Sequence, residues 1–162
     1  MAEVWIADAS PLVVLAKTGN LDLLRGLCAS VIVPPAVAKE VLAGREDDPA
    51  RKALETGWGV RSEPTQIPGS VREWGLGPGE EAVLAEALRR PGAVALLDDA
   101  QGRRAAKTLR IPVRGTLGVL LLAKQRGLIP SFTDAVANLT DAGFYVDQAL
   151  VSLLSKAARD TQ

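Results

Sequence analysis

Residues 93–122 read AVALLDDAQGRRAAKTLRIPVRGTLGVLLL, and this stretch decides the fold. A short apolar run ends abruptly in Asp98 and Asp99. A helical pattern follows, and a second short strand then leads through a turn at Gly115-Thr116 into another helix. A buried strand that delivers acidic side chains at its carboxyl end is how open parallel sheets present chemistry. We therefore expect Asp98 to be one corner of an acidic metal site.

Other segments repeat this pattern of a short apolar strand followed by a helix. Residues 4–7 form an apolar run that ends at Asp8, and residues 30–33 form a second run before two prolines open a helix. A further strand is expected at residues 111–113, with a small edge strand around Val60. This alternation predicts an α/β protein, a three-layer α/β/α sandwich with a central parallel sheet of about four to five strands.

Composition limits both the size and the chemistry of the protein. The 162 residues, 48% of them hydrophobic, predict one domain over residues 1–162. The sequence has no histidine and one cysteine, which excludes a Ser-His-Asp triad, histidine-ligated metals and a zinc-thiolate cluster. The formal net charge is zero, so no global basic field attracts nucleic acid. We find no signal peptide and no membrane span, and we expect a soluble, cytoplasmic protein.

Four carboxylates stand at comparable places in the expected fold. Asp8 and Asp98 follow strands, Glu40 shares a helix face with apolar residues, and Glu80 opens a helix that runs to about Arg89. Loops at the carboxyl ends of parallel strands converge on one crevice, where these acids would repel one another strongly without a cation. Carboxylate oxygens suit Mg²⁺ or Mn²⁺, and such a site without histidine suits phosphodiester hydrolysis.

Each acid also has a simpler structural explanation. Asp8 or Asp98 could cap the following helix, because aspartate is favoured at that position. Glu80 could complement a helix N-terminus, and Glu40 could pair with a nearby basic side chain. Of the two acids after the strand in the opening stretch, we predict that Asp98 is the metal ligand and that Asp99 is a cap or a helper.

Four sequence segments, taken in order, resemble the PIN-domain family. They read VWIADASPL around Asp8, VIVPPAVAKEVL around Glu40, GPGEEAVLAEAL around Glu80, and ALLDDAQGRRAAKTLRIPVRGTLGVLLLAKQRGLI from Ala95. The family comprises metal-dependent nucleases that include the VapC-type toxins of toxin–antitoxin pairs, and the last segment resembles a poorly characterised toxin-like subgroup. The resemblance covers about residues 4–129, and the rest of the chain matches less distinctly.

The resemblance implies a function and a set of site residues. Asp8, Glu40 and Asp98 would be metal-site acids, Glu80 would stand where many members have aspartate, and Asp99 would be an adjacent extra acid. The implied ions are Mg²⁺ or Mn²⁺, the substrate is RNA, and the partner is an antitoxin protein. The chain would then be a divalent-metal-dependent endoribonuclease, the toxin of a type II pair. The family's habit, together with an apolar helix at residues 117–123, predicts a homodimer.

Residues after the acidic pair supply candidates for RNA contact. Basic side chains outnumber acidic ones from residue 98 to residue 126, and of these we predict that Arg103 and Arg104 contact phosphates. A solvated helix face is the alternative. Thr116 could add a hydroxyl near the metal and the RNA, or could be a helix N-cap. No aromatic residue interrupts this stretch, so base stacking is not inferred from it.

Three rival functions stay open. A related fold could act on DNA as a flap nuclease or exonuclease, and a PIN-like protein with an incomplete site could only bind partners. A receiver domain also places acids around Mg²⁺ at strand ends. However, Arg114 and Gly115-Thr116 occupy the region where a receiver would carry its switch lysine.

Overall fold

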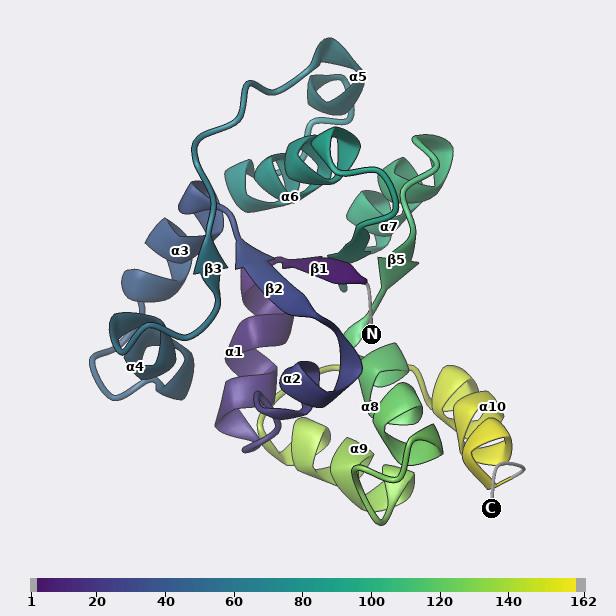
Figure 1. The fold of residues 1–162 in the computed structure, drawn as a ribbon. Helices are drawn as coiled ribbons and strands as arrows, with labels where there is room; N and C mark the ends of the chain where they lie inside the picture. The colour runs from purple at the N-terminus through teal and green to yellow at the C-terminus, as the bar shows by residue number, and fades with distance from the viewer. Residues whose placement is uncertain (1–2, 160–162) are drawn as a thin grey trace.

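The computed structural model describes residues 3–159 of the chain. In chain order its elements are β1 (Val4–Ala7), α1 (Ala9–Lys17), α2 (Leu23–Leu27), β2 (Ser30–Val33), α3 (Pro35–Leu42), α4 (Pro49–Glu55), β3 (Val60–Arg61), α5 (Gly69–Arg72), α6 (Pro78–Arg89), β4 (Val94–Leu96), α7 (Ala100–Thr108), β5 (Val113–Arg114), α8 (Thr116–Gln125), α9 (Phe132–Asp141) and α10 (Gln148–Arg159). The strands form one parallel sheet in the order β3-β2-β1-β4-β5, with helices against both faces (Figure 1). The three-layer α/β/α prediction is therefore confirmed.

Strand β1 lies at the centre of the sheet and carries the densest part of the core. Trp5 pairs in register with Val31 of β2 on one side and with Val94 of β4 on the other. Both neighbours and Trp5 itself are buried, so this strand reads as a continuous apolar run rather than an alternating one. The guanidinium of Arg114, on β5, lies over the Trp5 ring, 5.5 Å from its centre.

The last strand starts later than the sequence predicts. The sequence predicts a strand at 111–113, whereas β5 covers Val113–Arg114. Proline at position 112 has no N–H to give to the ladder, although its carbonyl accepts from Ala95 N at 2.8 Å. The N–H of Ile111 turns back to the carbonyl of Ala106 at 2.8 Å and closes the end of α7 instead.

The helices are divided between the two faces of the sheet. Figure 1 shows α6 and α7 on one side of it and α1, α2 and α8 on the other. Helix α8, which is apolar nearly all round, contacts α2, α9 and α10 of the same chain. Its partly buried leucines pack against the common core. A second chain is thus not needed to cover α8, and the expected homodimer rests on the family resemblance alone.

Helix starts follow the chemistry of proline and aspartate. Pro35, Pro49 and Pro78 stand at the first positions of α3, α4 and α6, where a missing N–H costs nothing. Helix α1 begins at Ala9 with Asp8 in the capping position. Serine followed by proline at positions 10 and 11 predicts a helix start with Ser10 as the cap. This prediction is wrong by two residues, because a proline is tolerated anywhere in the first turn, where N–H groups have no intrahelical partner.

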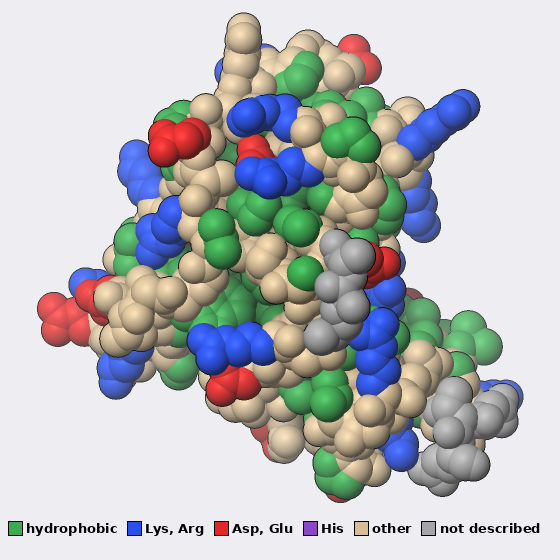
Figure 2. Space-filling view, in the orientation of Figure 1, with side chains coloured by type: hydrophobic (Ala, Val, Ile, Leu, Met, Phe, Trp, Pro, Cys, Tyr) green, Lys and Arg blue, Asp and Glu red, His purple; other side chains and the backbone are tan. Residues whose placement is uncertain are grey.

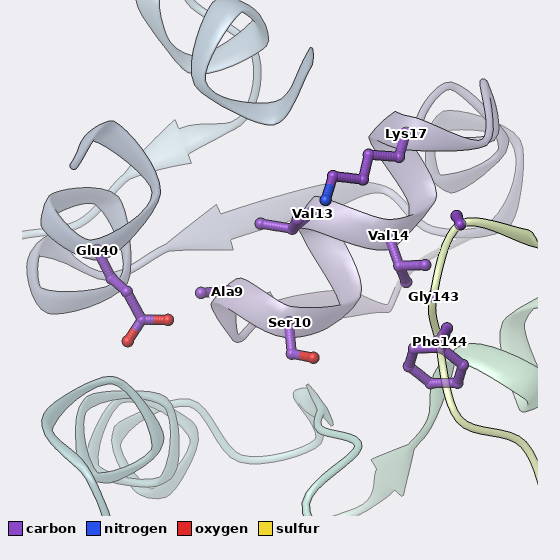
Figure 3. Close-up of a pocket in the computed structure, with 9 residues that line it drawn as sticks. Ala9, Ser10, Val13, Val14, Lys17, Glu40, Gly143 and Phe144 are labelled. Atoms are coloured by element: carbon purple, nitrogen blue, oxygen red, sulfur yellow. The ribbon is translucent and has the colours of Figure 1, made fainter. Parts of the chain in front are cut away.

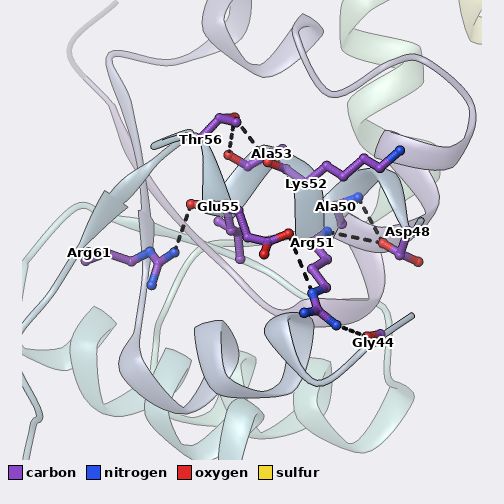
Figure 4. A network of polar contacts seen from close by, with 10 residues as sticks. Gly44, Asp48, Ala50, Arg51, Lys52, Ala53, Glu55, Thr56 and Arg61 are labelled. Carbon is purple, nitrogen blue, oxygen red and sulfur yellow. Dashed lines mark hydrogen bonds and ion pairs between the residues drawn. The ribbon is translucent and has the colours of Figure 1, made fainter. Parts of the chain in front are cut away.

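Local polar contacts order the stretch between α3 and β3, which the sequence suggests is irregular. Asp48 caps α4 by accepting from the N–H of Ala50 at 2.9 Å (Figure 4). Arg51 donates to the carbonyl of Gly44 at 2.8 Å, and Arg61 donates to the carbonyl of Leu54 at 3.3 Å. These bonds join α4 to the segments on either side of it.

A buried carboxylate fastens the next loop to α6. The Glu86 side chain is 2% exposed, accepts from Arg90 Nε at 2.9 Å and from Thr65 Oγ1 at 2.8 Å, and has Arg89 Nη1 at 3.6 Å. Two cations and a hydroxyl thus compensate its burial. Glu86 belongs to the scaffold and lies apart from the four predicted site acids.

Figure 2 shows both basic and acidic side chains on the face of the molecule that it draws, as a net charge of zero suggests. None of the helices within residues 3–159 combines the length and the apolar character that crossing a membrane requires.

Candidate active site

The order of the strands places the candidate site where β1 and β4 lie side by side. From β1 the chain moves outward to β2 and β3 on one side, and it then returns to build β4 and β5 on the other. A crevice forms at the carboxyl ends of the two strands at such a reversal. Asp8 follows β1 directly, and its N–H donates to the carbonyl of Leu96, the last residue of β4, at 3.1 Å. Asp98 comes two residues later, so both acids reach the same crevice.

Asp8 is the most buried of the predicted site acids, with 7% of its surface exposed. It stands at the capping position of α1, but its side chain makes no capping hydrogen bond, so the cap explanation fails for Asp8. Its pKa is raised from 3.8 to about 6, mainly by burial, while the N–H of Ala9 acts in the opposite direction. The negative charges of Glu80, Glu40 and Asp98 contribute to this rise, which places all three carboxylates within electrostatic range of Asp8.

Glu80 is half-buried in the first turn of α6. Burial is the main reason that its pKa is raised, and the charge of Asp99 is the next. A backbone hydrogen bond at Gly77 lowers the pKa, and the charge of Glu40 raises it. Glu80 therefore lies between the acids at the end of β4 and the acid on α3, and it links them electrostatically.

Gly79 provides the space in which two of these carboxylates meet. A Cβ atom at this residue would stand 3.0 Å from Asp8 Oδ1 and 3.8 Å from Glu40 Oε1. Both oxygens therefore lie within 4 Å of one point above the first turn of α6. A side chain at position 79 would occupy the space that the carboxylates share. Gly79 is not among the site residues predicted from the sequence, although a glycine between the helix-opening proline and Glu80 indicates that space is needed there.

Glu40 is exposed to solvent, whereas its place beside an apolar stripe predicts an inward-facing residue. It lies on the wall of a hollow of about 260 Å³ between α3, α1 and the segment that follows α9. Figure 3 shows its carboxylate extending from α3 toward the first turn of α1, where Ala9 and Ser10 lie. Lys17 and Phe144 line the same hollow. Of the four predicted metal-site acids, Glu40 is thus the one exposed to solvent.

Asp98 is the acid that the protein holds most firmly. Its Oδ1 accepts from the N–H of Thr116 at 2.7 Å, and its Oδ2 accepts from the hydroxyl of the same residue at 2.6 Å. Thr116 is the first residue of α8, so the carboxylate also faces the positive end of that helix. These two bonds fix the orientation of Asp98 before anything binds.

The structure corrects the role predicted for Thr116. The residue is fully buried, so it offers no surface to RNA, and the N-cap of α8 is Gly115. Thr116 instead positions Asp98, which lies 18 residues earlier in the chain. Gly115 is packed closely as well, because a Cβ there would collide with the Arg103 guanidinium and stand 3.1 Å from Asp98 Oδ1.

Asp99 is a helix cap, as the sequence predicts. Its side chain caps α7 by accepting from the N–H of Gly102 at 2.8 Å. It also faces Glu80 closely enough to raise the pKa of that group. Asp99 therefore contributes charge to the cluster while one of its oxygens holds the helix.

The two predicted RNA-contact arginines differ in how free they are. Arg103 is partly buried, its Nη1 lies 3.5 Å from the carbonyl of Leu97, and its guanidinium packs over Gly115. Arg104 is exposed on α7. Arg103 thus supports the loop that carries Asp98, while Arg104 is available to a ligand.

The cluster suits a divalent cation by charge and by chemistry. Within residues 3–159, no group of three or more acidic or cysteine side chains is already arranged to hold a metal ion. Asp8, Glu40, Glu80 and Asp98 nevertheless offer oxygen donors, which Mg²⁺ and Mn²⁺ prefer. The raised pKa of Asp8 and the space at Gly79 show that these carboxylates crowd one region. To share one ion they would have to turn toward one another.

One family model matches this chain over nearly its whole length. A family model described as a PIN domain matches residues 4–160. No curated protein matches the chain. The matched range contains the five strands and the four carboxylates at the end of β1 and β4 and on α3 and α6.

Proposed function

The chain belongs to the PIN-domain family, and from that premise we propose that it is a divalent-metal-dependent endoribonuclease. The fold is of the nuclease type, and the specific reaction is inferred from the carboxylate cluster. The observation that carries the proposal is the environment of Asp8, whose buried carboxyl lies within electrostatic range of three further carboxylates and shares the space at Gly79 with one of them, Glu40. A protein maintains such mutual repulsion where a cation relieves it.

Four side chains would hold the ion, and other residues of the chain orient them or leave space for them. Asp8, Glu40, Glu80 and Asp98 are the proposed ligands for Mg²⁺ or Mn²⁺. When bound, such an ion supplies the positive charge that makes a water molecule more acidic and that stabilises charge on a phosphodiester. Thr116 keeps Asp98 in one orientation, and Gly79 leaves the space in which Asp8 and Glu40 approach.

The toxin half of a type II toxin–antitoxin pair is the biological role that we propose for this nuclease. The support is the resemblance of the four acid-bearing segments to the PIN-domain family, which includes the VapC-type toxins, and of the last segment to a toxin-like subgroup. In this role the enzyme would cut RNA in the cytoplasm, would be held inactive by an antitoxin protein, and would act as a homodimer. Arrest of growth on expression, abolished by Asp98→Asn, is the expected sign of the role. Normal growth with fully active enzyme would contradict it.

Cleavage of single-stranded RNA tests the enzymatic proposal. We expect the wild type to cut RNA in Mn²⁺ and to stop in EDTA. Asp8→Asn and Asp98→Asn should lose more than the about 10–100-fold that loss of a supporting hydrogen bond costs at a metal site. Asp22→Asn removes an acid that is 85% exposed and that follows α1 at the end opposite Asp8. This control variant should cut normally.

Two results would overturn the proposal in distinguishable ways. If Asp8→Asn and Asp98→Asn cut RNA as fast as the wild type, the carboxylates are not the active site. If the wild type leaves RNA intact but cuts branched DNA, the protein is a DNA nuclease of the same fold. Calorimetry with Mn²⁺ completes the test, because a wild type that binds no ion would be a partner-binding protein rather than an enzyme.

A further inference from the structure

A second hollow, of about 520 Å³, begins at Asp98 and runs along α7. It shares Phe144 with the hollow that contains Glu40. One wall consists of α7, which presents Arg103, Arg104 and Lys107. The other wall is the segment between α9 and α10, with Phe144 and Tyr145. The hollow therefore joins one of the proposed metal-site acids to a cationic wall and an aromatic one.

Tyr145 is unusual because 85% of its surface is exposed. A tyrosine left this far in water contributes little to the core, and both faces of its ring are available to a flat ligand. Phe144, next to it, is half-buried and packs against the core, which fixes the backbone that carries Tyr145. The sequence could not show that these aromatic residues lie opposite α7, because about 40 residues separate them from Arg104 along the chain.

The cations on α7 have charge to offer to a ligand. Within the described part of the chain, neither Arg104 nor Lys107 takes part in a salt bridge, and both are exposed. The hollow also contains two acids, which are outnumbered by the three cations of α7. Asp98 accepts two bonds from Thr116, and Asp147 accepts from the N–H of Ala149 at 2.9 Å at the start of α10. The hollow thus keeps a positive wall in a molecule of zero net charge.

We propose that this hollow binds single-stranded RNA beside the bond to be cut, with a base stacked on Tyr145 and phosphates against Arg104 and Lys107. The inference rests on the proposed function and assigns the residues that bind the RNA beside the cleavage site. Phosphates fit a cationic wall, and a base can lie on an exposed ring only where it is free of a paired partner. A protein ligand would not require both features together.

The two hollows share one lining residue and so give the strand a path from one to the other. Phe144 lines both of them, with Glu40 in one and Asp98 in the other. Figure 3 shows the Phe144 ring on the wall of the first hollow opposite Glu40. A strand that leaves Tyr145 and passes Phe144 would run from the hollow that contains Asp98 into the hollow that contains Glu40 and Lys17. The scissile phosphate would lie between the hollows.

Binding measured without cleavage tests this inference separately from the proposed function. The probe is a short single-stranded RNA that carries 2-aminopurine, titrated with the full chain in EDTA. Stacking quenches this base, so we expect quenching with the wild type and with Tyr145→Phe. Tyr145→Leu should lose the quenching and bind about tenfold more weakly. Tyr145 is largely exposed, so these variants should fold like the wild type.

A second pair of variants tests the cationic wall. Arg104→Ala should lower the slope of log binding constant against log salt concentration by about 0.7, the value for one phosphate contact on a single strand. Lys52→Ala is the matched control, because it removes one exposed cation from α4, where Figure 4 shows the side chain directed away from the polar network. Its slope should equal that of the wild type.

Four outcomes would overturn the inference. Equal binding by Tyr145→Leu and Tyr145→Phe would exclude stacking, and equal slopes for Arg104→Ala and Lys52→Ala would exclude the phosphate contact. Equally strong binding of a fully paired RNA would exclude selection of single strands. If Tyr145→Leu changes the molar mass in light scattering and leaves RNA binding unchanged, the hollow is a protein interface. A wild type that binds but does not cut in Mn²⁺ would leave this inference standing and refute the proposed function.

Discussion

Replacing Asp8 with asparagine should stabilise the fold while it abolishes cleavage. A pKa raised from 3.8 to about 6 corresponds to about 3 kcal/mol of unfolding free energy lost when Asp8 is ionised. The introduced asparagine would keep the size of the side chain and the preference for the start of a helix, and it would carry no charge to bury. We therefore expect Asp8→Asn to be more stable than the wild type by about 1–3 kcal/mol near pH 7 in EDTA.

The pH dependence of this gain follows from the direction of the pKa change. Because the folded protein holds the Asp8 proton more tightly than the unfolded chain, wild-type stability falls as pH rises from about 4 to about 6, and it is level above that range. Glu80, whose pKa is also raised, contributes in the same direction. The advantage of Asp8→Asn should therefore fall to about half at pH 5 and nearly vanish at pH 4.

Urea unfolding followed by tryptophan fluorescence measures this prediction, since Trp5 is fully buried in β1. Asp22→Asn is the control, because its carboxylate is exposed, and its stability should stay within about 0.5 kcal/mol of the wild type at each pH. If Asp8→Asn is no more stable than the wild type near pH 7, or if its gain is as large at pH 4, the electrostatic account of the cluster is wrong.

Three further changes address the supports of the site and of the scaffold. Thr116→Val should lower cleavage by about 10–100-fold because it removes the hydroxyl bond to Asp98 Oδ2 and leaves only the bond from the backbone N–H, while Thr116→Ser should retain most of the rate; equal rates for the two variants would refute the positioning role. Gly79→Ala should lower Mn²⁺ affinity in calorimetry while thermal unfolding shows a folded protein, because the added methyl group would stand 3.0 Å from Asp8 Oδ1; unchanged affinity would contradict this. Glu86→Gln should lower the unfolding free energy by about 1–3 kcal/mol in urea because it removes the buried charge that Arg90 and Thr65 bind, and a neutral effect would show that the loop gains nothing from this contact.

Much of the architecture was predictable because its signals are local. Short apolar runs that end in an acid or in paired prolines predict β1, β2 and β4, and the helical spacing after Gly77 predicts α6. The start of α1 and the limits of β5 were not predicted correctly. A proline inside a first turn and a strand of two residues leave too little pattern to place a boundary.

The sequence predicts the acids of the candidate site but not the residues that position them or that line the neighbouring hollow. Strand ends predict that Asp8 and Asp98 share a crevice, and the structure brings Glu40 and Glu80 to the same region. The bond from Thr116 to Asp98 spans 18 residues, and the approach of Tyr145 to α7 spans more. Such contacts depend on how α7, α8 and α10 pack, which no periodicity within one segment encodes.

The shortness of the two edge strands limits how this protein can assemble. β3 and β5 have two residues each, so the sheet offers few unpaired backbone groups at either border. Extension of a sheet by a strand from another chain needs a longer template. Any second copy or regulatory protein must therefore recognise side chains on helices and loops, and its specificity can change by surface substitution without disturbing the sheet that positions the acids.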